Sequence, residues 1–276
     1  MTHRPSFAAS SVVSLTLAAT LLVPGGAGAQ DVPQEFKNFM AYLALSVTPV
    51  GALPPLVTRS MAGGPAAISG SSGATGGALR PQIAFRYGRV SLATDSPGDY
   101  ADINAFAATG LIAAGEAATL SATAGLLDPT CRDCESEWMF GVAGDVALGG
   151  TQLGTQAGSP RLTYGLSGEL GYANIEDTKP LSLTAGVPIA LVAQSGTMRF
   201  VPYLVPAVGY GRTRFDAGDP TYGAFRFLLG GGVSLLNVAN ALSVNAGFQK
   251  VFFSFDTGFG KITSKTLFGA SITIGN

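Results

Sequence analysis

Histidine and charged residues are scarce in this sequence. Only 12% of its 276 residues are Asp, Glu, Lys or Arg, about half the usual share in a soluble domain. The single histidine, His3, lies in the N-terminal stretch that we interpret as a cleaved signal. A mature chain without histidine can form neither a Ser-His-Asp triad nor a histidine metal site. We therefore expect no enzyme activity, no cofactor and no metal.

Long apolar runs are also missing. No run of about 18 apolar residues occurs outside the N-terminus, which argues against membrane helices. The formal net charge is −1 and there is no block of basic residues, which argues against a nucleic-acid partner. Yet 47% of the residues are hydrophobic, which is too apolar for a typical soluble protein. Together these properties indicate a membrane protein built from β-strands.

Residues 1–29 have the pattern of a secretory signal. Arg4 supplies the positive start, residues 11–23 form a short apolar core, and residues 27–29 offer a small-residue cleavage site. The core is short for a retained membrane anchor. The mature chain would begin near Gln30 and enter an oxidising compartment.

From residue 81 onward, turn signals separate segments in which apolar and polar residues alternate. We count ten such segments: 81–94, 100–113, 117–127, 137–149, 161–174, 180–194, 198–213, 222–236, 240–255 and 263–275. In 161–174, for example, Leu162 and Tyr164 share one face while Thr163 and Ser167 share the other. A period of two residues is that of a β-strand.

The composition of the two faces favours a transmembrane barrel over a soluble one. The polar faces are rich in Gly, Ser and Thr rather than in Lys and Glu, as in a narrow lumen. The apolar faces carry aromatic residues near the strand ends, as in the girdles of membrane barrels. These aromatic residues are Tyr87, Trp138, Tyr164, Tyr172, Phe225 and Phe268. We predict an all-β, antiparallel, up-and-down transmembrane β-barrel of about ten strands.

The odd-numbered connections between segments differ from the even-numbered ones in length and charge. The odd-numbered connections carry ten acidic residues, from Asp95 to Asp256, whereas the even-numbered ones carry only Glu116 and three of the four are tight. Long outer loops and short periplasmic turns are typical of outer-membrane barrels. This parity places both ends of the barrel domain in the periplasm.

On these features, residues 81–276 resemble the small outer-membrane β-barrel proteins of Gram-negative-type bacteria, the OmpA/OmpX/OmpW-like group. The resemblance implies outer-membrane lipid and the barrel-assembly machinery as partners. Such barrels usually end in an aromatic residue, whereas this chain ends in Ile274, Gly275 and Asn276. The group includes adhesins, passive transporters, lipid enzymes and structural proteins, so the resemblance assigns no single function.

Residues 30–80 precede the barrel domain. Phe36, Phe39, Met40 and Leu43 recur at helical spacing, which predicts an amphipathic helix over 33–47. The same region also alternates, so a strand is the alternative. Residues 48–80 are rich in Pro, Gly and Ser and have the composition of a linker. We expect the helix to pack on the barrel mouth; filling the lumen or lying on the membrane surface are the alternatives.

Cys131 and Cys134 lie in the third connection. In an exported protein we expect them to form a disulfide that closes this small loop.

Five charged residues occupy polar faces of the predicted strands: Arg86, Asp145, Glu169, Arg226 and Lys265. A charge in a lumen needs a partner or water. These side chains would form a salt-bridge network that fills the lumen or, alternatively, a gate or selectivity ring for a small polar solute. A hydrolase that pairs Asp145 with Glu169 is the least favoured alternative.

Three prolines, Pro188, Pro202 and Pro206, lie in segments six and seven. Proline removes a hydrogen bond from a β-ladder, so these residues mark either local bulges or a lateral seam in the barrel wall.

We therefore expect a non-enzymatic outer-membrane barrel with a narrow lumen, in a structural or small-solute transport role. One alternative is a barrel that takes a lipid or another hydrophobic ligand through the proline-bearing wall. The other is a soluble, secreted, lipocalin-like barrel with its apolar face inside.

Overall fold

The computed structural model describes most of the chain after residue 33. The described residues are 34–58, 61, 81–93, 101–114, 117–130, 135–155, 158–175, 178–215, 221–239, 242–256, 261–264 and 266–275. The signal sequence (1–29), the two cysteines and Lys265 lie outside these residues.

Within residues 34–58, two helices precede the strands. Helix α2 spans Gln34–Val47 and α3 spans Pro49–Ala52. Thr48 separates them in an extended conformation and is the N-cap of α3, and Pro49 follows at the first helical position. Proline suits that position because its fixed φ is helical and the missing N–H has no partner there in any case. The predicted helix is thus confirmed, and its strand alternative is wrong.

Thirteen strands make up the sheet. They are β1 Gln82–Ala93, β2 Ala101–Ala113, β3 Ala118–Pro129, β4 Glu137–Gln152, β5 Arg161–Ala173, β6 Thr178–Gly186, β7 Ile189–Ser195, β8 Met198–Phe215, β9 Tyr222–Ala239, β10 Leu242–Val251, β11 Ser254–Asp256, β12 Lys261–Ser264 and β13 Leu267–Ile274. We call each pass of the chain from one end of the barrel wall to the other a crossing. Three crossings are each divided into two strands, namely β6 and β7, β10 and β11, and β12 and β13. Both β6 and β7, for instance, lie between β5 and β8. The wall therefore has ten crossings, each matching one predicted segment.

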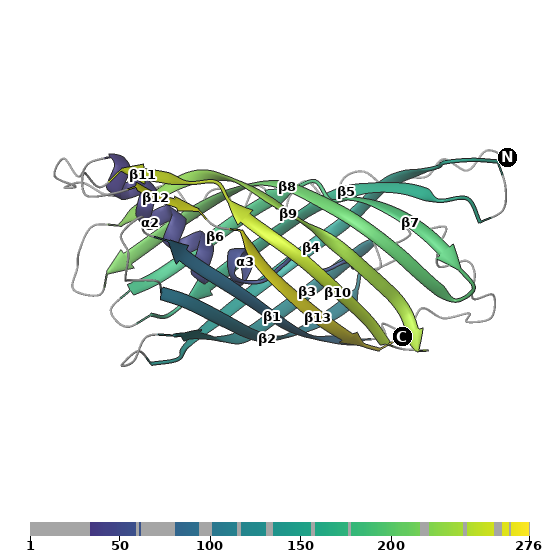
Figure 1. The fold of residues 1–276 in the computed structure, drawn as a ribbon, viewed down its shortest axis with the longest axis horizontal. Helices are drawn as coiled ribbons and strands as arrows, with labels where there is room; N and C mark the ends of the chain where they lie inside the picture. The colour runs from purple at the N-terminus through teal and green to yellow at the C-terminus, as the bar shows by residue number, and fades with distance from the viewer. Residues whose placement is uncertain are drawn as a thin grey trace, which may run out of the picture. The chain divides into compact units, whose positions relative to one another are not determined.

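The sheet closes on itself. Strand β1 pairs with β2 on one side, through Gln82↔Leu111, and with β13 on the other, through Ile83↔Ile274. All the pairings between neighbouring crossings are antiparallel. The prediction of a closed, antiparallel, all-β barrel of about ten strands is confirmed (Figure 1).

The two faces of the wall are inverted relative to a soluble barrel. Phe225 is 67% exposed and Phe268 66% exposed, whereas Thr109 and Ser182 are fully buried. The outer face is thus apolar and the inner face is lined by small polar residues. Contact of such an apolar outer surface with water is unfavourable, whereas contact with lipid is favourable. This is the arrangement of an outer-membrane β-barrel. No helix in the described part of the chain is long and apolar enough to cross a membrane.

The segment before the barrel runs inside the lumen. The carbonyl of Met40 accepts a hydrogen bond from Thr213 near the end of β8, and Pro55 accepts one from Tyr203 in the middle of β8. Met61 packs with Val201, near the start of β8. The chain therefore runs antiparallel to β8 along the barrel interior, and Figure 1 shows α2 near β11 and β12 with α3 further along. We call residues 40–58 with Met61 the lumen segment.

This position differs from the expected one on the barrel mouth. The reason is the small size of the inward-facing residues, which leaves room for a second backbone. A Cβ atom on Gly88 would collide with the carbonyl of Ala52, and one on Gly211 with the carbonyl of Ala41. Glycine at these two places lets the wall and the lumen segment approach closely. Residues 48–58, expected to be a linker, are likewise enclosed: Thr48 to Pro54 are all buried.

Candidate functional site

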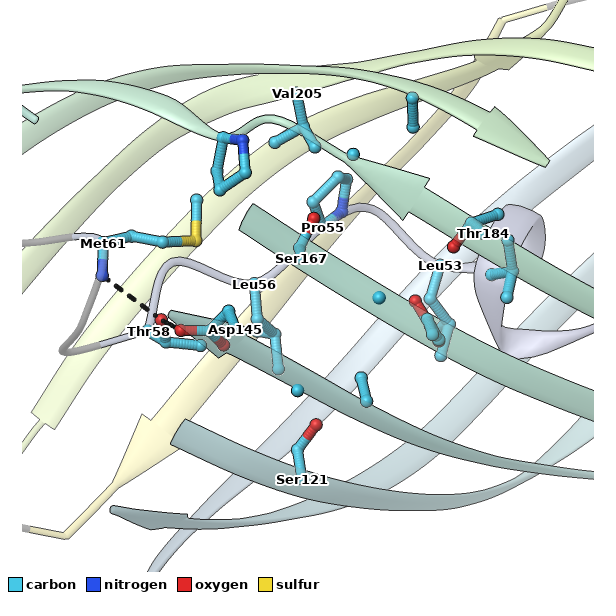
Figure 2. A pocket seen from close by; sticks show the side chains of 18 of the residues that line it. Leu53, Pro55, Leu56, Thr58, Met61, Ser121, Asp145, Ser167, Thr184 and Val205 are labelled. Atoms are coloured by element: carbon cyan, nitrogen blue, oxygen red, sulfur yellow. Dashed lines mark hydrogen bonds between the residues drawn. The ribbon is translucent and has the colours of Figure 1, made fainter. Parts of the chain in front are cut away.

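A cavity of about 100 Å³ lies between the lumen segment and the barrel wall. Leu53, Leu56 and Thr58 border it on the side of the lumen segment, and the wall contributes hydroxyl groups and charges. The hydroxyl groups belong to Ser121, Thr123, Ser167 and Thr184. The charged side chains are Arg86, Asp145 and Glu169. Figure 2 shows the lumen segment crossing this space, with Thr58 beside Asp145.

Asp145 accepts a hydrogen bond from the C-terminal end of the lumen segment. The hydroxyl of Thr58 donates a hydrogen bond to Asp145 Oδ2 at 2.7 Å, and the backbone N–H of Met61 donates to Thr58 Oγ1 at 3.4 Å (Figure 2). The carbonyl of Met61 in turn accepts a hydrogen bond from Thr163 Oγ1 at 2.6 Å. A carboxylate acceptor makes the first of these bonds the strongest.

Glu169 lies next to Asp145 on the inner face of the wall. Asp145 on β4 is opposite Ser167 on β5, and Glu169 is opposite Ala143. The two carboxylates are therefore diagonal neighbours across β4 and β5, with Cβ atoms roughly 7 Å apart. Glu169 makes no hydrogen bond with any described residue, yet it keeps accessible surface inside a closed barrel. That surface faces the cavity.

Arg86 enters the cavity from β1. Its side chain is 8% exposed, Nη2 donates to the carbonyl of Pro54 at 2.6 Å, and Nη1 makes a long contact of 3.5 Å with Thr109 Oγ1. Its Nε has no partner. Arg86 and Glu169 attract each other electrostatically but form neither an ion pair nor a hydrogen bond. Opposite charges are thus held apart across the cavity.

Polar side chains from β8 and β10 hold the lumen segment on its other side. The carbonyl of Pro55 accepts hydrogen bonds from the Tyr203 hydroxyl at 2.8 Å and from Asn245 Nδ2 at 3.3 Å. Gln249 Nε2 donates to the carbonyl of Val50 at 3.2 Å, and Gln249 Oε1 has no partner. Sequence reasoning did not single out these residues or Thr58. The alternation in segment nine, which sets Asn245 and Gln249 on one face, was the available signal.

Arg226, the fourth described member of the predicted lumen network, does not line this cavity. The guanidinium of Arg226 lies over the ring of Phe253, 5.7 Å from its centroid, and donates to the carbonyl of Phe225. Lys265 lies outside the described residues. Three of the five predicted side chains thus share one cavity, and no described ion pair joins them into the expected salt-bridge network. Arg89 of β1 and Asp102 of β2, two described residues that do not line this cavity, form an ion pair.

Two further predictions on side-chain chemistry concern the cysteines and metal ions. Cys131 and Cys134 lie outside the described residues, so their disulfide stays a prediction. Among the described residues no group of three or more His, Cys, Asp or Glu side chains could hold a metal ion.

The three prolines lie around the junction of β6 and β7. Pro188 is at the break between these strands and lines the cavity, whereas Pro202 and Pro206 are in β8. The N–H of Val187 donates to the carbonyl of Pro206 at 2.9 Å, which bridges the break. The ladder between β7 and β8 is interrupted between Ala190↔Tyr203 and Ala193↔Phe200, beside Pro202.

The chain is similar in fold to solved structures but matches no known sequence family. No protein-family model and no curated protein matches the chain. The translocator domain of the autotransporter NalP from Neisseria meningitidis is similar at 10% sequence identity and a TM-score of 0.31. The match covers 75% of this chain and 91% of that one. The class of the protein follows from its own architecture: a closed antiparallel barrel with an apolar outer face and a polar lumen is an outer-membrane β-barrel.

Proposed function

We propose that this protein is a non-enzymatic, gated pore for small polar solutes, held closed by its lumen segment. The observation that supports this proposal is the cavity between the lumen segment and the wall, which carries both charges and hydroxyl groups. A barrel of this size can be filled by the side chains of its own wall. Here the wall side chains are small, and a separate stretch of backbone fills the space instead.

The hydrogen bonds between the lumen segment and the wall are weak enough for the segment to act as a gate. Wall side chains donate one hydrogen bond each to the carbonyl groups of Val50 and Pro54 and two to that of Pro55. A bond between neutral groups contributes a net free energy of about 1 kcal/mol, and the bond from the charged Arg86 contributes about 1.5–3 kcal/mol. These values are small because water can replace either partner when the segment leaves. These polar contacts can be exchanged for water step by step. The apolar contacts that Leu45, Val50 and Leu53 make with the wall stabilise the closed position.

A disulfide between the lumen segment and the wall tests the proposal. Thr48 Oγ1 and Ser182 Oγ are 2.6 Å apart, so the double variant Thr48→Cys/Ser182→Cys can form a disulfide without a large backbone shift. In planar bilayers we expect wild-type openings to disappear in the oxidised double variant and to return on reduction. The single variants Thr48→Cys and Ser182→Cys control for the native cysteines.

Two outcomes would contradict the gated pore. Openings that persist in the fully oxidised double variant would show that solutes pass without movement of the lumen segment. A wild-type protein that never conducts, at any voltage or solute, would leave a structural role as the function of the barrel.

A second candidate function is the binding of a hydrophobic ligand that enters through the wall. The specific observation in its favour is that Pro188 lines the cavity while the β7–β8 ladder is interrupted nearby. Saturable binding of a fluorescent fatty acid to the purified protein would support this candidate, and selective conductance without such binding would exclude it.

A further inference from the structure

We infer that the cavity is a binding site for a compact zwitterion, a small molecule with one anionic and one cationic group, as in an amino acid. This inference rests on the proposed function for the route by which the molecule would arrive, and it names the class of solute. It is carried by the separation of opposite charges across the cavity, by the buried donor Arg86 Nε, which has no partner, and by the Glu169 carboxylate, which makes no hydrogen bond with a described residue.

The anionic end of the molecule would bind to Arg86. This side chain is more than nine-tenths buried, and its Nε donor has no partner. Its Nη2 donor is used by the carbonyl of Pro54, a neutral group that leaves the positive charge without a direct counter-ion. A carboxylate in the cavity would supply that counter-ion, and a small rotation of the guanidinium would bring the buried Nε to it. An arginine binds a carboxylate with directional, charge-assisted hydrogen bonds.

The cationic end would bind to Glu169. Its carboxylate faces the cavity without a hydrogen bond to any described residue, and the neighbouring Asp145 is already engaged by the hydroxyl of Thr58. Gln249 Oε1 is not part of this end of the site, because it lies against Gly230 and Pro55. An ammonium group has three donors and no acceptor, so it matches carboxylate oxygens.

A ligand with one charge alone fits the cavity less well. A simple anion would gain Arg86 but would lie close to two carboxylates, Asp145 and Glu169. A simple cation would gain the carboxylates but would be repelled by Arg86. Only a molecule with both charges satisfies the three side chains at once, and in an enclosed site these charge–charge energies are larger than in water.

The size of the cavity limits the molecule. A cavity of about 100 Å³ is smaller than the roughly 150 Å³ that accommodates benzene in a protein interior. The solute is therefore compact, with few atoms beyond its two charged groups. Glycine, the smallest amino acid, is the natural probe.

The test is equilibrium dialysis of radiolabelled glycine against the full-length protein purified in detergent. We expect saturable binding that unlabelled glycine competes for, with acetate and methylammonium at least about tenfold weaker as competitors, as expected for the loss of one charge-assisted contact. If acetate competes as well as glycine, the cavity is an anion site; if methylammonium does, it is a cation site; either result overturns the inference, as does the absence of glycine binding.

The matched variants are Glu169→Gln and Glu135→Gln. The first removes the carboxylate that faces the cavity and breaks no hydrogen bond, and we expect it to weaken glycine binding at least about tenfold. The second removes the same charge from an exposed residue outside the strands, and we expect no change. The shift in gel mobility on boiling verifies that both variants are assembled. Equal affinity in an assembled Glu169→Gln variant overturns the assignment.

Failure of this inference is distinguishable from failure of the gated pore, because binding is measured without conductance. A protein that conducts but does not bind glycine refutes the site alone. A protein that binds glycine but never conducts refutes the pore alone.

Discussion

The hydroxyl of Thr58 in the lumen segment donates a 2.7 Å hydrogen bond to the carboxylate of Asp145 on the barrel wall. Thr58 is buried, and the same hydroxyl accepts a bond from the N–H of Met61. One side chain therefore joins the wall to the last described turn of the lumen segment. The two residues are 87 positions apart in the sequence, so the contact depends on the barrel being closed around its own N-terminal segment.

The variant Thr58→Val tests whether this hydrogen bond keeps the lumen segment in the closed position. Valine keeps the shape of threonine but removes the donor, which leaves Asp145 facing the cavity without its partner. Loss of a hydrogen bond to a charged group costs about 1.5–3 kcal/mol, so we expect the open fraction in planar bilayers to rise about tenfold or more.

The control for Thr58→Val is Thr197→Val, in the two-residue turn between β7 and β8. This residue is exposed and remote from the cavity, and we expect wild-type gating. An unchanged open fraction in Thr58→Val would show that Asp145 does not hold the segment.

Gly88 offers a second test, of the position of the lumen segment. Because a Cβ atom there would meet the carbonyl of Ala52, the variant Gly88→Ala forces the segment away from β1. Overpacking of this kind typically costs about 1–3 kcal/mol. We expect a barrel that still assembles but unfolds at a lower temperature, measured by the temperature at which the gel mobility shift is lost.

Gly110→Ala is the matched substitution on β2. No atom lies within 4 Å of the added Cβ, so we expect the thermal transition to stay within error of wild type. If both variants behave alike, the segment does not press against Gly88 in the assembled protein.

The proline-bearing junction makes a prediction about backbone protection. The amide groups of Leu191 and Val192 lie where the β7–β8 ladder is interrupted, whereas β8 and β9 pair without a gap from Arg199↔Leu236 to Thr213↔Tyr222. On their other side Leu191 and Val192 pair with Leu162 and Arg161 of β5. Because ladder hydrogen bonds alternate between the two sides of a strand, we expect exchange faster than along β9 only at the amide that points to β8, where ladder bonds are missing. The variant Pro202→Val restores a backbone N–H and should slow this exchange. Full protection of β7 in the wild type would exclude a lateral seam.

The period of two residues was enough to predict the wall. In β5, Thr163 is buried and faces the lumen while Leu162 and Tyr164 are exposed on the outer face, as their alternation indicates. The polarity of the inward residues also indicated that Arg86, Asp145 and Glu169 face the interior. Pattern alone could not place Arg226, because its distance along the barrel axis depends on the register between β8 and β9.

The lumen segment could not be predicted in the same way. Its contacts are made by the carbonyl groups of Val50, Pro54 and Pro55, and every residue type has a carbonyl group. No side-chain periodicity records such contacts, and abundant Pro and Gly are equally typical of a linker. The information lies instead in the wall, where glycines such as Gly211 leave room for a second backbone.

The orientation of the outer face can be tested with the single tryptophan. Trp138, at the start of β4, is 55% exposed and stacks on Phe140 at 6.3 Å between ring centroids. Aromatic residues at this place on a membrane barrel lie at the level of the lipid headgroups and upper acyl chains. In vesicles of brominated phospholipid we expect strong quenching of Trp138 fluorescence, with little quenching by aqueous iodide. The variant Phe140→Leu controls for the ring stack, since it alters the neighbouring ring but keeps the outer face apolar. Strong iodide quenching with no effect of bromine would mean that this face meets water, and the barrel would then not span a membrane as described.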